Sequence, residues 1–91
     1  MKRTADLRAL LDAVLAAGQA CGPDTAELFT DRDGESFEDR YAREQQARAI
    51  CRSCPARAAC ETYYQAIRPR DGVWAGLSQE DRDSLRAQAV A

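Results

Sequence analysis

The sequence predicts a small all-α domain of four to five helices that fold around a group bound by cysteine side chains. Three observations lead to this prediction. Apolar residues recur with helical spacing near the N-terminus, and serine or proline residues mark three later helix starts. Three of the four cysteines fall within the ten residues 51–60.

The chain is too short and too rich in alanine to build a large core. It has 91 residues, which predicts a single domain. A domain of this size buries only about 60% of its unfolded surface, so we expect a staple in the form of disulfides or a metal site. We divide the domain 1–91 into an N-terminal helix (1–19), a cluster-binding core with a turn (20–76) and a C-terminal helix (77–91).

The N-terminus predicts neither secretion nor membrane insertion. Met1-Lys2-Arg3 leads into an amphipathic stretch, and no segment approaches the ~18 apolar residues that a membrane span needs. We therefore expect a cytoplasmic protein with no membrane partner, in which a cysteine cluster more often binds metal or performs redox chemistry than forms disulfides. The net charge of −2 argues against non-specific binding of nucleic acid.

The first helix is predicted over residues 4–17, with Thr4 as its cap and Gly18 as its stop. Its apolar face, which we interpret as core packing rather than as a docking face, consists of Leu7, Leu10, Leu11, Val14 and Leu15. A short turn is expected near residues 25–30. The polar segment 31–35 is expected to be an exposed, mobile loop.

Two serine-based capping boxes predict the starts of two further helices. Ser36 and Asp39 open a helix that runs to about Ile50 or Cys51, and we expect its inward face to consist of Phe37, Tyr41, Ile50 and the alanines. Ser78 and Asp81 open the last helix.

Pro55 is predicted to stop the second helix and to take the first position of the next. That third helix should run to about Ile67 and present one side to the core: Ala59, Cys60, Tyr63, Tyr64 and Ile67. Residues 73–76 are a short non-helical piece bounded by glycines.

The cysteine spacing points to a metal group. Two residues separate Cys51 from Cys54, five separate Cys54 from Cys60, and Cys21 stands thirty positions before Cys51. Four thiols and no histidine leave a tetrahedral zinc ion or an iron–sulfur cluster as the main occupants. Zinc modules usually pair two close knuckles, so the spread spacing found here favours the larger iron–sulfur cube.

Charge gives a weaker argument for a cluster. Three arginines flank the motif and would offset the negative charge of a thiolate-ligated cluster, unless they are solvated surface charges: Arg48, Arg52 and Arg57. The alternative for the cysteines themselves is a disulfide between Cys51 and Cys54, or buried free thiols.

These features together resemble the WhiB-like (Wbl) family of small actinobacterial iron–sulfur regulators. The resemblance covers about residues 20–86 and rests on Cys21, Glu27-Leu28-Phe29, Ile50-Cys51-Arg52-Ser53-Cys54-Pro55 with Arg57 and Cys60, and Gly72-Val73-Trp74-Ala75-Gly76. It implies an all-helical fold on a [4Fe-4S] cluster ligated by Cys21, Cys51, Cys54 and Cys60. It also implies binding to region 4, the C-terminal region of the primary sigma factor of RNA polymerase, and a response to nitric oxide or oxygen.

The chain departs from the family pattern at three places. Ala75 stands where the family usually has glycine, and a positive φ there would cost about 1 kcal/mol or more. Thr30 follows Phe29 where a second aromatic residue is frequent. The last helix carries only Arg82 and Arg86 against three acids, so we expect promoter DNA to be contacted weakly or through the sigma complex.

Trp74 has two interpretations, a ring packed against the cysteine-bearing helices or an exposed aromatic anchor for a partner. With Gly72, Val73, Gly76 and Phe29 it forms the predicted partner-binding set. The hypothesis is therefore a redox- or nitric-oxide-responsive transcriptional regulator and not an enzyme. The alternatives are a thiol–disulfide oxidoreductase that uses Cys51 and Cys54, and a zinc-bound interaction module of the same shape.

Overall fold

The computed structural model describes residues 4–90, which form four α-helices and one 3₁₀ helix. In chain order these are α1 (Thr4–Ala17), η1 (Pro23–Leu28), α2 (Phe37–Arg52), α3 (Arg57–Ile67) and α4 (Gln79–Val90). Over the same residues there is no strand, and the one β-bridge pairs Trp74 with Leu77. The all-α prediction is confirmed.

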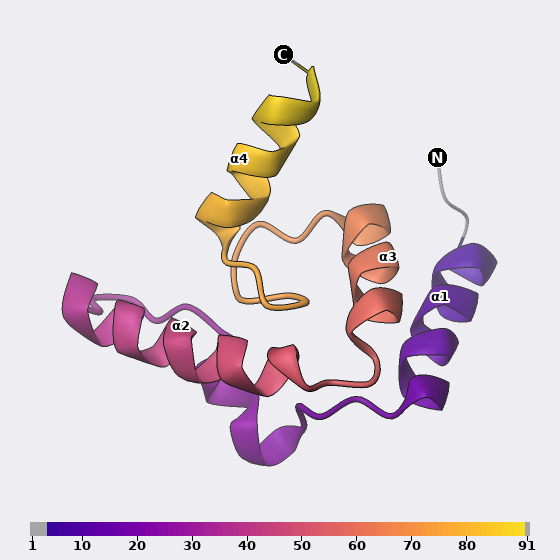
Figure 1. Ribbon diagram of the computed structural model, residues 1–91, viewed down its shortest axis with the longest axis horizontal. Helices are drawn as coiled ribbons and strands as arrows, with labels where there is room; N and C mark the ends of the chain where they lie inside the picture. The colour runs from indigo at the N-terminus through magenta and orange to yellow at the C-terminus, as the bar shows by residue number, and fades with distance from the viewer. Residues whose placement is uncertain (1–3, 91) are drawn as a thin grey trace.

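The helices surround the loop that joins α3 to α4. Helices α1 and α3 pack side by side, and η1 lies against α2, which crosses the lower part of the view in Figure 1. The loop after α3 turns back toward the middle of the molecule, and α4 then extends away from the other helices (Figure 1). None of the described helices is long and apolar enough to cross a membrane.

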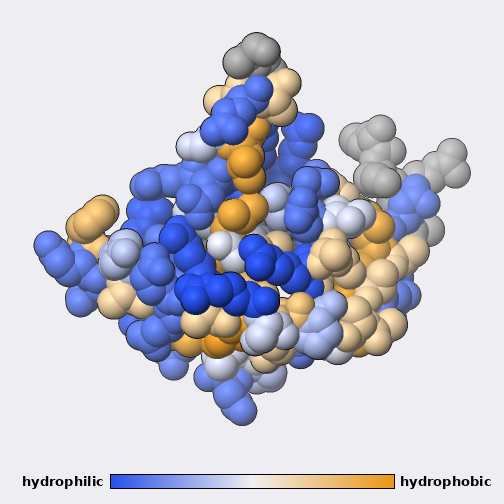
Figure 2. All heavy atoms as spheres, viewed as in Figure 1, coloured by the Kyte–Doolittle hydropathy of each residue, from blue (hydrophilic) through white to orange (hydrophobic). Residues whose placement is uncertain are grey.

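The core is small, as the alanine-rich composition predicts. The buried apolar residues are Val14, Ala47, Cys51, Ala56, Tyr64, Val73 and Ala75, and no large side chain is fully buried among the described residues. Figure 2 shows hydrophobic atoms gathered over α1 and α3 and in a narrow strip along α4. Such a core leaves the fold dependent on polar contacts or on a bound group.

Helix α1 has the predicted bounds, and Gly18 ends it with a φ of +86°. Thr4 is itself the first helical residue, and the residues before it lie outside the described part of the chain. Only part of the predicted apolar face packs inward, because Val14 is buried while Leu15 is 55% exposed. The inward side of α1 is the one that meets α3.

The predicted inward face of α2 is wrong at its two aromatic residues, whereas Ala47 is buried and Ile50 is half-buried. Phe37 and Tyr41 are 78% and 57% exposed, and their rings stack on each other with centroids 6.5 Å apart. The buried side of the helix carries Arg43, Ala47 and Cys51, which are spaced by four residues and so share one face. Hydrophobicity alone misses this face because its first member is an arginine.

Arg43 is buried because its charge is neutralised. Its Nε and Nη2 donate to the two carboxylate oxygens of Glu35 at 2.7 and 2.8 Å, Nη2 donates to Asp31 at 3.0 Å, and Nη1 donates to the carbonyl of Leu28 at 3.1 Å. The hydrogen bond from Arg43 lowers the pKa of Glu35. The segment 31–35, predicted to be a mobile exposed loop, is thus anchored at both ends.

The helix starts are confirmed at two of the three predicted places. The Ser36 hydroxyl accepts from the backbone N–H of Asp39, and Ser78 and Asp81 exchange hydrogen bonds in a reciprocal capping box. Pro55, by contrast, lies in the turn between helices, and α3 starts at Arg57 after Ala56. The chain needs the extra two residues to turn sharply after Cys54.

Candidate metal centre

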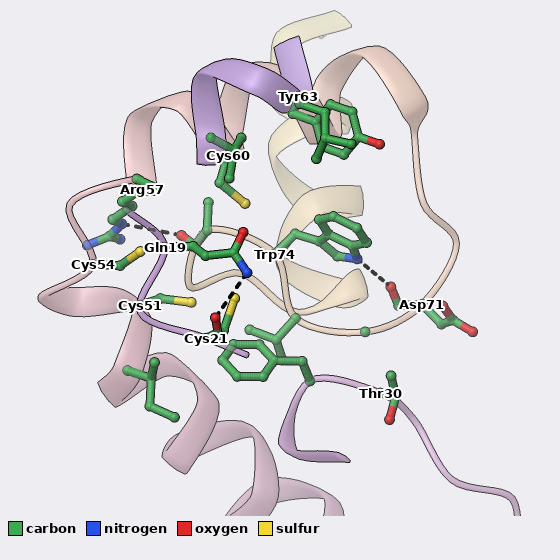
Figure 3. Close-up of a pocket in the computed structure, with 18 residues that line it drawn as sticks. Gln19, Cys21, Thr30, Cys51, Cys54, Arg57, Cys60, Tyr63, Asp71 and Trp74 are labelled. Carbon is green, nitrogen blue, oxygen red and sulfur yellow. Dashed lines mark hydrogen bonds between the residues drawn. The ribbon is translucent and has the colours of Figure 1, made fainter. Parts of the chain in front are cut away.

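The four cysteines, which come from three separate parts of the chain, line one cavity of about 410 Å³. Cys21 lies between α1 and η1, Cys51 in the last turn of α2, Cys54 in the turn that follows, and Cys60 in the first turn of α3. Figure 3 shows the four side chains around a common space, with the side chain of Gln19 reaching between them. All four are free thiols, so no disulfide joins Cys51 to Cys54.

Short backbone hydrogen bonds bring the cysteine segments together. The N–H of Cys54 donates to the carbonyl of Cys51 at 3.1 Å, which closes the turn within the C-x-x-C motif. The N–H of Ala20 donates to the sulfur of Cys54 at 3.3 Å. This contact holds the Cys21 segment against the α2–α3 turn, across more than thirty residues of sequence.

Five consecutive residues of the cavity wall, 71–75, come from the loop between α3 and α4. We name residues 71–77 the tryptophan loop. Trp74 and Leu77 exchange two backbone hydrogen bonds of 2.9 Å each, and Ala75 and Gly76 between them have φ values of +52° and +83°. Positive φ at both central positions identifies a type I′ turn. The expected strain at Ala75 is therefore real.

The tight turn lies close to two of the cysteines. A Cβ added at Gly76 would lie 3.5 Å from the Cβ of Cys51, and Ala75 lines the cavity together with Cys60. Burial raises the pKa of the Cys51 and Cys60 thiols above the ordinary value, and hydrogen bonding to the backbone of Gly76 and Ala75, respectively, acts in the opposite direction. Amide donors of this kind stabilise thiolate sulfur when it serves as a ligand.

The donor set of the cavity is compatible with a bound metal group. Four thiols line a space of about 410 Å³, and thiolate sulfur is the usual ligand of iron–sulfur clusters. The residues present therefore fit an iron–sulfur cluster. Among the described residues, no three His, Cys, Asp or Glu side chains gather closely enough to hold a single metal ion.

The flanking arginines do not act as a set. Arg57 lines the cavity, and its Nε donates to the carbonyl of Ala75 at 3.3 Å. Arg48 pairs with Asp81 of α4 at 2.9 Å, and Arg52 is exposed. Of these three arginines, only Arg57 lies close enough to the cavity to offset the charge of a bound cluster.

Trp74 is partly packed and partly exposed, and its role as an anchor for a partner stays a prediction. The residue is half-buried, lines the cavity, and lies with its ring centroid 6.3 Å from that of Tyr63. Its Nε1 donates to the carbonyl of Asp71 at 3.1 Å, an exposed contact that is visible in Figure 3. One part of the indole therefore packs inward while another part meets solvent.

The other predicted partner-binding residues lie close to Trp74. Phe29 is half-buried and its carbonyl accepts from the N–H of Val73 at 2.9 Å. Val73 is 3% exposed, and Gly72 is buried against the same carbonyl. These positions fix the tryptophan loop to the end of η1.

Sequence reasoning missed Arg82. The sequence indicates only that Arg82 is one of two arginines in the last helix, but the residue is 3% exposed and its Nη1 donates to the carbonyl of Gly72 in the tryptophan loop. The sequence feature that could have indicated this burial is the capping box at Ser78. It starts the helix there, and the N–H of Arg82 donates to the carbonyl of Ser78, so position 82 falls in the first turn, next to the preceding loop.

The profile described as "Transcription factor WhiB" matches residues 16–85, which is most of the chain. The chain belongs to the WhiB family. It is 39% identical over 70 residues to the transcriptional regulator WhiD of Streptomyces coelicolor, a match that covers 77% of this chain and 62% of WhiD. The chain thus spans less than two thirds of the length of that relative.

Two further WhiB-family relatives are similar over comparable lengths. The redox-responsive transcriptional regulator WhiB3 of Mycolicibacterium smegmatis is 35% identical over 65 residues, covering 71% of this chain and 68% of the relative. The transcriptional regulator WhiB of S. coelicolor is 32% identical over 75 residues, covering 81% and 86%. The relatives are thus named as regulators of transcription, and some as redox-responsive.

Proposed function

We propose that this WhiB-family chain is a redox- or nitric-oxide-responsive transcriptional regulator that binds region 4 of the primary sigma factor through a surface organised by a [4Fe-4S] cluster. The observation that carries the proposal is that Cys21, Cys51, Cys54 and Cys60 line the same cavity as Trp74 and Ala75. This shared cavity brings the candidate ligands next to the loop that carries Trp74.

In this proposal Cys21, Cys51, Cys54 and Cys60 are the four ligands. When bound, the cluster supplies a redox-active and nitric-oxide-reactive centre that also links three segments of a chain with a small core. The N–H of Ala20 stabilises the sulfur of Cys54, and Arg57 supports the turn by donating to the carbonyl of Ala75.

The partner surface centres on Trp74. An aromatic side chain on a rigid turn is the type of residue that dominates binding energy at interfaces. Phe29 adds apolar area beside it, while Gly72, Val73 and Gly76 hold the loop in shape rather than touch the partner. Loss of the cluster would release the cysteines that line the cavity together with the tryptophan loop, and the surface would then loosen.

The charge distribution supports a protein partner over DNA. The last helix presents Glu80, Asp83 and Arg86 to solvent, while Arg82 is buried and Asp81 is paired with Arg48. Helix α4 therefore lacks the run of free cations that phosphate binding requires. We propose that promoter DNA is contacted weakly or through the sigma complex, in the cytoplasm where RNA polymerase acts.

Enzymatic thiol–disulfide exchange is the weaker alternative. An attacking cysteine needs access to solvent and a lowered pKa. Cys51 is 8% exposed, and burial raises its pKa. We therefore propose a regulator that is not an enzyme.

The direct test of the partner surface replaces Trp74. Trp74→Ala should weaken binding to isolated sigma region 4 by about tenfold or more, with the iron content unchanged. Tyr41→Ala is the matched control, because Tyr41 is an exposed aromatic residue on another part of the fold. Equal binding by Trp74→Ala and the unsubstituted chain would contradict the proposed surface.

The test of the cluster requirement replaces Cys54. Cys54→Ala should give colourless protein that no longer co-purifies with the sigma factor, since the surface depends on the group that the thiols hold. A Cys54→Ala protein that is brown and still bound to sigma would contradict this part of the proposal.

A further inference from the structure

Arg82 gathers the backbone carbonyls at both ends of the tryptophan loop. Its Nη1 donates to the carbonyls of Gly72 at 2.9 Å and Leu77 at 2.8 Å, and its Nη2 donates to the carbonyl of Asp71 at 3.1 Å. Nη2 also donates to the side chain of Gln79 at 2.7 Å. One side chain therefore ties together the residues before and after Trp74.

No carboxylate forms an ion pair with this guanidinium in the described part of the chain, although its residue is 3% exposed. Burial lowers the pKa of Arg82, and the ring of Tyr64 lies 5.8 Å from its Cζ. A buried cation held mainly by neutral carbonyls is costly, so its position calls for a reason beyond surface charge.

The location of α4 supplies that reason. The helix extends away from the other helices (Figure 1), and it approaches the rest of the fold through its first turns. The capping box at Ser78 and the ion pair between Arg48 and Asp81 fix this first turn. Together they direct position 82 under the loop.

We propose that Arg82 is the positioning residue for Trp74, because it holds the tryptophan loop in its binding conformation through the backbone carbonyls at both ends of the loop. Planar forked geometry is essential to this role, because Nη1 and Nη2 together serve four acceptors in fixed directions, and an ammonium has only three N–H donors. The inference rests on the proposed function for the use of Trp74, but the loop geometry can be measured without any partner.

The experiment compares Arg82→Gln, Arg82→Lys and the control Arg86→Gln, which removes an exposed arginine one turn further along α4. Amide hydrogen exchange is followed in the loop and in α1 and α3, with iron content measured on the same samples. Acrylamide quenching of fluorescence reports on Trp74, the only tryptophan in the chain.

In Arg82→Gln, the Trp74 and Leu77 amides should exchange about tenfold faster or more, with stronger Trp74 quenching and unchanged protection in α1 and α3. The exchange rates of Arg82→Lys should lie between those of Arg82→Gln and the unsubstituted chain. The exchange rates of Arg86→Gln should equal those of the unsubstituted chain. Unchanged loop exchange in Arg82→Gln would overturn the inference, as would an equal loss of protection throughout the molecule.

Sigma region 4 binding separates this inference from the proposed function. Weaker binding by Arg82→Gln at unchanged iron content supports both. A loosened loop in a chain whose unsubstituted form binds no sigma factor would support Arg82 as the positioning residue while contradicting the proposed partner.

Discussion

Ala75 lines the same cavity as Cys60, and it holds a left-handed φ of +52°. The residue beside a candidate ligand is therefore strained. This conformation costs a residue with a side chain about 1–2 kcal/mol, and glycine adopts it freely.

We expect Ala75→Gly to stabilise the chain by about 0.5–1 kcal/mol, because relief of strain exceeds the added entropy of the unfolded state. Denaturant unfolding measures this change. The control is Ala49→Gly, at an exposed position inside α2, which should destabilise by about 1 kcal/mol. Destabilisation of the same size by both variants would contradict the assignment of strain to Ala75.

Gly72→Ala should be strongly destabilising. Gly72 has a φ of +80°, and a Cβ there would lie 2.5 Å from the carbonyl oxygen of Phe29. We expect a loss of about 2–4 kcal/mol in the free energy of unfolding.

Gly34→Ala isolates the steric part of the effect at Gly72. Gly34 has a similar φ of +74°, but a Cβ added there would meet no atom within 4 Å, so only backbone strain of about 1–2 kcal/mol applies. If both glycine variants lose the same stability in parallel unfolding curves, the close approach of the loop to Phe29 is not the cause.

Glu35 makes stability depend on pH at the acidic end. Its folded pKa lies below the ordinary value of 4.5, chiefly through the hydrogen bond from Arg43. The stabilisation is therefore present above the unfolded pKa and is lost as pH falls through the folded pKa. Glu35→Gln should be less stable than the unsubstituted chain at pH 7, and the gap should narrow below about pH 4.

Thermal unfolding of the two proteins across this pH range tests the prediction for Glu35. Asp33→Asn, at an exposed position of the same loop, should leave a curve parallel to that of the unsubstituted chain. A gap between Glu35→Gln and the unsubstituted chain that stays constant down to low pH would show that the pair with Arg43 does not carry the effect.

Local patterns predicted much of this fold. The helical spacing of apolar residues predicted the bounds of α1, and the capping boxes at Ser36 and Ser78 predicted the starts of α2 and α4. These features could be read from the sequence because each depends on a few neighbouring residues. The C-x-x-C spacing and the lone Cys21 led to the expectation of one shared site, and the four cysteines do line one cavity.

The buried arginines could not be predicted in the same way. Arg43 depends on Glu35 and Asp31, and Arg82 depends on carbonyls of a loop, so the compensation for each buried charge comes from tertiary contacts. Burial of Arg43 in turn directs Phe37 and Tyr41 to solvent, opposite to their hydrophobicity. A hydrophobicity scale assigns each residue a value by itself, so it does not include the hydrogen-bond partners that make burial of a charge possible.

The central proposal is that the four thiols hold one [4Fe-4S] cluster. Iron and acid-labile sulfide analysis of anaerobically purified protein tests it most directly, together with the visible absorption spectrum and the variant Cys21→Ala. We expect about four iron and four sulfide per chain and a brown colour that Cys21→Ala abolishes. A colourless native protein that carries zinc without sulfide, or a Cys21→Ala protein that keeps the full cluster, would contradict the proposal.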